Sequence, residues 1–218
     1  MAVGRSSLAG VLRLNAKSLV FAVIVLMMAY VAQHNESFLF DRSDPEWPHI
    51  EPFKWWLLIH GLAGACALVL APFQFSDWLR QRYAKVHRRI GWTYVSGVFL
   101  LAPLGVYIQY LEERTGAPRS FTIATAVDAV LLTTTTAIAL YFILTRKIQQ
   151  HRQWMTRSYA VALVFFEVRL ISGVLGLDNA GDAVIETIIW ICIAAAIPVA
   201  DIALQIQESR LVRKSPAR

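Results

Sequence analysis

The sequence predicts an all-α protein, a polytopic bundle of about six transmembrane helices with both termini on the cytoplasmic side. Three observations predict this class. Of the 218 residues, 56% are hydrophobic and 17% are charged, and the mean hydropathy is +0.48, which exceeds what soluble domains normally have. The apolar residues form long runs, each close to the about 20 residues that cross a bilayer. The basic residues gather in alternate breaks between these runs.

Windows of about 20 predominantly apolar residues place the spans at 14–33, 54–75, 90–111, 121–145, 159–177 and 183–206. The first apolar run is too long for the core of a signal peptide and is not followed by a small-residue cleavage pattern. Pro103 and Pro198 fall inside the third and sixth spans, where each is expected to kink its helix. Because the longest break, near residues 33–53, is short, we expect one integral membrane domain over residues 1–218.

Basic residues predict the orientation, because short cytoplasmic loops retain lysine and arginine. They occur before the first span and after the second, fourth and sixth, at Arg5, Arg13, Lys17, Arg80, Arg82, Lys85, Arg88, Arg89, Arg146, Lys147, Arg152, Arg157, Arg210, Arg213, Lys214 and Arg218. The first outer break instead carries acidic residues, at Glu36, Asp41, Asp44, Glu46 and Glu51. The formal net charge of +6 is explained by this topology and by anionic lipid headgroups, so no nucleic-acid partner is expected.

Five polar residues inside the predicted spans are candidates for a functional site, because an ionisable group there usually faces a partner, a cavity or a ligand. They are His60, Gln74, Asp128, Glu167 and Arg169. A rise of about 1.5 Å per residue puts His60, Asp128 and Arg169 in one layer below the outer boundary. There we expect an ion pair between Asp128 and Arg169, or a role for these residues in binding a ligand or carrying a proton. Glu167 points about 200° away from Arg169 around the helix, so the two are not expected to share a pocket.

His60 also begins a stripe of small residues at helical spacing, which continues through Gly64, Ala67 and Ala71 to Gln74. Small residues let a neighbouring helix approach closely. The stripe therefore predicts a helix contact, and the alternative is a slot for a flat or elongated lipophilic ligand.

Two similar strings lie at the cytoplasmic ends of the third and fifth spans. The strings are H-R-x-x-G-x-x-Y and H-R-x-W-M-x-R-S-Y, with the candidate residues His87, Arg88, Gly91, Tyr94, His151, Arg152, Trp154, Arg157, Ser158 and Tyr159. Arginine and aromatic side chains are typical of anchors at the headgroup level. The repeated H-R dipeptide predicts in addition one shared site, which holds an anionic headgroup, a carboxylate or a haem.

A b-type haem requires two axial ligands at matching depth on facing helices. His87 and His151 match in depth, whereas His34 and His49 lie at or beyond the outer boundary. Because His60 has no histidine partner at its own depth, the chain offers at most one haem with two histidine ligands. No other metal site is predicted.

The strings occur in a defined order. His60 is followed by P-F-Q-F at residues 72–75, then by H-R-x-x-G-x-x-Y, and then by H-R-x-W-M-x-R-S-Y-A. From about residue 55 to residue 169 this order resembles the bacterial membrane proteins of domain-of-unknown-function family 2306. The resemblance implies a multi-pass protein of the bacterial cytoplasmic (inner) membrane and brings no established activity. The histidine-bearing helices are also similar, by analogy, to b-type cytochromes and to small helical proteins that assemble haem-copper oxidases.

Three classes of function remain open. We expect a non-enzymatic protein of the lipid bilayer that binds a lipid, a quinone or a small anionic molecule, or that assists the assembly of a membrane complex. The alternative is a subunit of a haem b- or quinone-dependent oxidoreductase, so whether the protein is an enzyme stays open. A transporter is disfavoured, because no inverted repeat and no matching pair of Gly/Pro-interrupted spans is visible.

Overall fold

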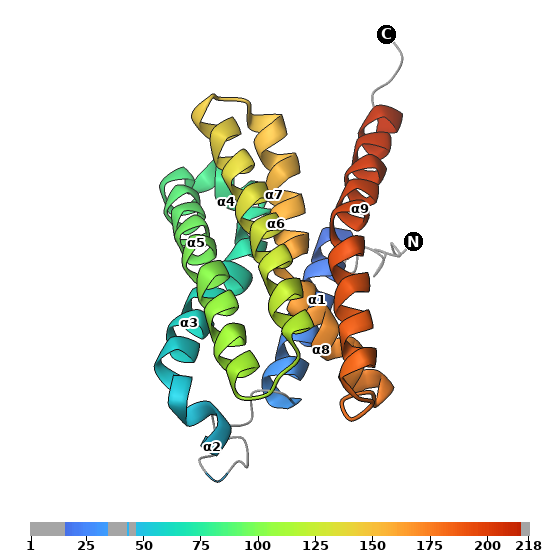
Figure 1. Cartoon of the computed structure of the whole chain (residues 1–218). Coiled ribbons are helices and arrows are strands. Elements are labelled where there is room, and N and C mark those ends of the chain that lie inside the picture. Colours follow the sequence, from blue (N-terminus) through green and yellow to red (C-terminus); the bar gives the residue numbers. More distant parts are fainter. Residues whose placement is uncertain (1–15, 35–42, 44–46, 215–218) are drawn as a thin grey trace, which may run out of the picture.

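The computed structural model describes residues 16–34, 43 and 47–214, and its regular elements are helices (Figure 1). They are α1 (Ala16–His34), α2 (Trp47–Ile50), η3 (Glu51–Phe53), α3 (Lys54–Gln74), α4 (Asp77–Arg82), α5 (Ala84–Arg114), α6 (Arg119–Leu144), α7 (Ile148–Ala162), α8 (Val164–Leu175) and α9 (Asp182–Lys214). The all-α prediction is confirmed for this part of the chain. Several residues on which the predicted orientation depends lie outside it, namely Arg5, Arg13, Glu36, Asp41, Asp44, Glu46 and Arg218.

Four helical segments are long and apolar enough to cross a bilayer: residues 47–74, α5, α6 and residues 182–209 of α9. α7 and α8 together make a fifth span if they cross as one unit, bent by 41°. α1 contributes a shorter apolar helix over Phe21–His34. The described residues thus support a membrane protein with four or five crossings, compared with the six that the sequence predicts.

Packing begins with α5, which lies against α3 on one side and α6 on another, while α7 runs along α6. α8 and α9 pack together, α9 also contacts α7, and α1 lies against α8. α3, α5, α6 and α7 form the left part of the view in Figure 1, and α9 forms the right edge. The polar residues predicted from the sequence lie on α3, α5, α6, α7 and α8.

The predicted small-residue stripe is a helix contact along part of its length. Ala67 and Ala71 are buried, and a Cβ atom on Gly97 of α5 would lie 2.9 Å from the backbone oxygen of Ala63. A Cβ atom on Gly64, in contrast, would meet nothing within 4 Å. The close approach of α3 to α5 therefore depends on Gly97 and the alanines opposite it.

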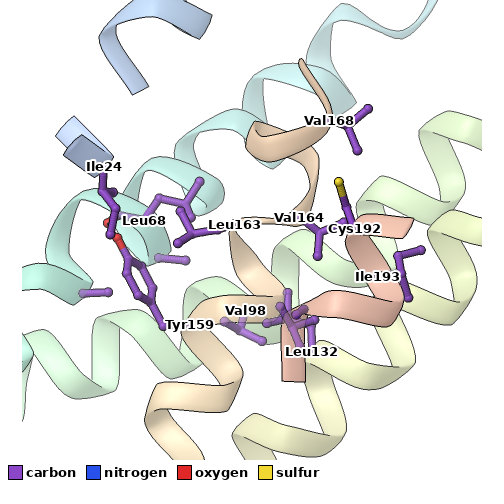
Figure 2. Packing of buried hydrophobic residues seen from close by; sticks show 14 of the residues in the cluster. Ile24, Leu68, Val98, Leu132, Tyr159, Leu163, Val164, Val168, Cys192 and Ile193 are labelled. Atoms are coloured by element: carbon purple, nitrogen blue, oxygen red, sulfur yellow. The ribbon is translucent and has the colours of Figure 1, made fainter. Parts of the chain in front are cut away.

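The fifth span differs from its predicted form. α7 begins at Ile148, so the whole string from His151 to Tyr159 is helical, and the bend falls at Leu163. The N–H of Leu163 bonds to both Tyr159 O and Ala160 O at 3.2 Å, which tightens the last turn of α7. Figure 2 shows Leu163 and Val164 at this bend, within the buried apolar cluster that also contains Cys192 and Ile193. This bend is not at either proline that was expected to kink a helix. Pro103 and Pro198 fall inside the continuous helices α5 and α9.

One end of the molecule gathers many of the basic residues. Figure 1 places α4, the start of α5, the end of α6 and the start of α7 together there, with the end of α9 on the same side. Arg152 Nη2 of α7 lies 4.0 Å from Asp77 Oδ1 of α4, and Gln153 Nε2 donates to Glu208 Oε1 of α9 at 3.0 Å. We call this region, residues 77–89 and 145–157, the basic end.

Candidate functional site

The two H-R dipeptides meet at the basic end. His87 of α5 and His151 of α7 are close enough to interact electrostatically, and Arg80 of α4 interacts with His87 in the same way. The Nδ1–H of His151 donates to Ala139 O of α6 at 2.8 Å, which leaves Nε2 of that ring to accept another bond. Nδ1 of His87 is buried and has no hydrogen-bond partner among the described residues. Since buried polar atoms are rarely unpartnered, His87 is the strongest candidate here for a group that contacts a ligand.

Asp77 connects the arginines of this end. Its Oδ1 accepts a hydrogen bond from Arg80 Nη2 at 2.6 Å and lies 4.0 Å from Arg152 Nη2. Arg80 therefore belongs to the candidate site, although the sequence analysis used it only to predict the orientation. No local signal distinguished it from Arg82, because which arginine faces His87 depends on how α4 packs against α5.

Three other predicted residues lie outside this cluster. Arg88 is exposed. Arg157 donates through Nε to Asp201 Oδ1 of α9 at 2.7 Å, and its guanidinium lies 4.8 Å from the ring centroid of Trp154. Arg157 and Trp154 thus join α7 to α9 and leave His151 and Arg152 to face α4 and α5.

A chain of hydroxyl groups lies deeper between α5, α6 and α7. Tyr94 Oη and Ser158 Oγ are 2.7 Å apart, Ser158 Oγ and Thr136 Oγ1 are 2.7 Å apart, and all three residues are fully buried. Thr136 donates its proton to Leu132 O at 2.7 Å. Thr136 must therefore accept from Ser158, and Ser158 must accept from Tyr94. Tyr94 of the first string and Ser158 of the second are thus joined, and each lies seven residues after the histidine of its string.

Gln74 links the P-F-Q-F segment to the same place. Its Nε2 donates to the backbone oxygen of His87 at 3.0 Å. A Cβ atom on Gly91 would lie 3.4 Å from Gln74 Oε1, so the glycine of the first string leaves room for this amide. Gln74 therefore positions the first turn of α5 and lies at the basic end, away from His60.

The outer-layer candidates separate into two groups. His60 donates through Nδ1–H to Leu101 O of α5 at 2.9 Å, so it lies against α5. Asp128 has an exposed fraction of only 5%, and its Oδ1 accepts no hydrogen bond from the described residues. The charged side chain that interacts with Asp128 is Glu167, whereas Arg169 lies on an exposed side of α8. This arrangement favours Glu167 over Arg169 as the neighbour of Asp128.

Among the described residues, no group of three or more His, Cys, Asp or Glu side chains is placed to hold a metal ion. A haem with two histidine ligands would require His87 and His151, which are close enough to interact electrostatically.

These helices and their internal hydrogen bonds define a multi-pass α-helical membrane protein. Residues 57–204 match the family described as "Predicted membrane protein (DUF2306)", and the chain belongs to this family. The match includes both H-R strings, Gln74 and the intramembrane residues from His60 to Arg169. Comparison with curated proteins and with solved structures finds no similar protein.

Proposed function

We propose that the protein binds a phosphate-bearing anionic ligand at the basic end, first of all the headgroup of an anionic lipid. The observation that carries the proposal is the convergence of Arg80, His87, His151 and Arg152 from three helices. The two arginines face the carboxylate of Asp77, and the two histidines interact with each other. Arginine donates strong hydrogen bonds to phosphate oxygens. The unpartnered Nδ1 of His87 and the oriented ring of His151 supply further contacts.

The location of the cluster supports a lipid as the source of the phosphate. α4 and the first turn of α5 precede the apolar run that begins at Ile90, so the cluster lies at headgroup level if the span crosses as predicted. Basic residues at this level attract the anionic lipids of the cytoplasmic leaflet. A soluble phosphate compound offers the same chemistry, and the two sources require separate measurements.

The test is thermal unfolding of the detergent-purified protein with added phosphatidylglycerol, phosphatidylcholine or inorganic phosphate. We expect phosphatidylglycerol alone to raise the Tm, because a ligand that binds the folded state stabilises it. The increase should shrink in Arg80→Gln and His151→Gln and persist in Lys85→Gln, which removes an exposed charge at the same end. Saturable stabilisation by inorganic phosphate would indicate a soluble ligand. An equal response in all three variants would reject a built site.

A second candidate is a haem held by His87 and His151, the oxidoreductase alternative. The bond from His151 Nδ1–H to Ala139 O favours it, because metal-ligating histidines usually donate their other ring nitrogen to an acceptor. The absorption spectrum of the purified protein is the test. A Soret band with reducible alpha and beta peaks, lost in His87→Ala, supports a haem. A colourless preparation from cells supplied with haem precursor removes this candidate.

We also propose six crossings, with both termini in the cytoplasm of a bacterium and the protein in its inner membrane. With α7 and α8 counted as one bent span, the sixth crossing is α1, which has 19 residues and therefore a length of about 28 Å. That length is close to the about 30 Å of a hydrocarbon core. The clustering of basic residues at one end of the bundle supports the orientation.

A further inference from the structure

Two acidic side chains lie near each other inside the predicted spans. Asp128 of α6 is buried, with Oδ1 lacking a hydrogen-bond partner among the described residues. Glu167 of α8 is half-buried, in the first turn after the bend at Leu163. The two side chains interact electrostatically, and as carboxylates they would repel.

The register of the helices explains why these two residues meet. α6 and α7 run antiparallel from the turn at residues 145–147, and Thr136 faces Ser158 across them. Asp128 lies eight residues before Thr136 and Glu167 nine residues after Ser158, so both lie at the same level. Beyond the bend, α8 packs against α9 and α1.

The neighbouring elements carry few titratable or charged groups near this level. Cys192 of α9 interacts with Glu167, and Arg169 of α8 lies two residues farther along on an exposed side. On α1, Tyr30 lies against Gly173, and His34 Nε2 lies 3.3 Å from Asp178 Oδ2. These two partners, Gly173 and Asp178, follow Glu167 in the chain by six and eleven residues.

We propose that Asp128 and Glu167 form a proton-binding pair inside the membrane, which holds one proton at neutral pH. Burial disfavours a charged carboxylate, and two carboxylates that interact in surroundings of low dielectric constant also repel. Protonation of one of them removes most of that cost. The unpartnered Oδ1 of Asp128 is an oxygen on which a proton can reside. Asp128 lies nine residues after Arg119, the first residue of α6, so a proton that enters from this end has about 13 Å to cover along the helix axis. This proposal is independent of any ligand at the basic end.

Infrared spectroscopy of the full-length protein in nanodiscs tests the pair. A protonated carboxylic acid has a carbonyl stretching band that is distinct from carboxylate bands and shifts in D₂O. At neutral pH we expect one such band in the wild type, and we expect it to disappear as the pH is raised. Asp128→Asn should abolish the band, and Glu167→Gln should make it disappear at a lower pH, because burial and the charge of Glu167 both favour the protonated form of Asp128. Glu113→Gln, which replaces a half-buried glutamate at the end of α5, is the matched control and should keep the band.

Three results would overturn the proposal. No protonated-acid band in the wild type would show that both groups are ionised, and this result requires no variant to fold. A band that disappears at the same pH in Glu167→Gln and in the wild type would assign the proton to burial of Asp128 alone. A band that is present in potassium chloride and lost in sodium chloride at the same pH would identify a sodium site in place of a proton site.

Discussion

The phenol of Tyr94 and the hydroxyl of Ser158 lie 2.7 Å apart in the middle of the bundle, and each is the seventh residue after the histidine of its own H-R string. α5 and α7 both begin at the basic end and run in the same direction (Figure 1). Two helical turns below the interacting histidines, at about 10 Å, the two strings therefore meet a second time. The repeated dipeptide reflects two parallel helices in matching register.

Removing the Ser158 hydroxyl should destabilise the fold by leaving the Tyr94 proton without an acceptor. Ser158→Ala is expected to lower the free energy of unfolding by about 1–2 kcal/mol, the cost of a stranded buried donor. Tyr94→Phe removes that donor, so the double variant should lose less than the sum of the single losses. Thermal unfolding in detergent measures this, with Thr134→Ala as a control because Thr134 is exposed on α6, the helix that carries Thr136. Additive losses would contradict the proposed hydrogen-bond chain.

Gly97→Ala should separate α3 from α5. The added methyl group would lie 2.9 Å from the backbone oxygen of Ala63, which cannot rotate away as a side chain can. Overpacking of this kind typically costs about 1–3 kcal/mol. Gly64→Ala is the matched control, because its methyl group meets nothing within 4 Å and alanine favours the helix by about 1 kcal/mol. A lower Tm for Gly97→Ala and an equal or higher Tm for Gly64→Ala are expected, and equal effects would argue against close contact at Gly97.

Cysteines placed at positions 87 and 151 should cross-link with a short bifunctional thiol reagent in the membrane-inserted protein. The electrostatic interaction of the two histidines and the matching register of α5 and α7 give the physical reason. The background should carry Cys66→Ala and Cys192→Ala. The pair 60 and 151 serves as a negative control, since His60 lies near the start of α3, at the opposite end of the bundle. Absence of a cross-linked product at 87 and 151 in folded protein would show that the two strings do not approach each other.

The six-span arrangement predicts the side on which inserted reporters lie. A reporter after Arg218 or near Lys85 should be active as a cytoplasmic fusion, and one near Glu46 as a periplasmic fusion, because the basic loops are retained inside. Paired phosphatase and fluorescent-protein fusions at each position make the measurement. A periplasmic C-terminus would require an odd number of crossings if the N-terminus stays inside.

Hydropathy alone predicted the middle of the fold well. The expected spans 90–111 and 121–145 correspond to α5 and α6, whose apolar runs are long and bounded by charged residues or turns. The bend at Leu163 could not be predicted, because A-V-A-L-V-F contains no proline or glycine and the break depends on how α8 packs against α1 and α9.

Depth along a helix was easier to predict than direction around it. A constant rise put Asp128 in the same layer as Arg169, and in the structure Glu167 interacts electrostatically with that carboxylate. Residues 167 and 169 project to different sides, so a bend of 41° decides which side faces α6. The convergence of the two strings could be predicted, because it requires only that α5 and α7 start at the same end of the bundle. They do so because a single span, α6, lies between them.

The charged residues of α8 affect how the protein enters the membrane during synthesis. α8 has 12 residues and includes Glu167 and Arg169, and a charged side chain near the centre of a helix costs about 2.5–3.5 kcal/mol during insertion by the translocon. The preceding α7 is too polar to offset this cost. α8 therefore requires an apolar partner at the moment of insertion, and α9, which packs against it, leaves the ribosome next. The two helices are expected to enter the bilayer together as a hairpin, which makes completion of α9 the step that commits the chain to its topology.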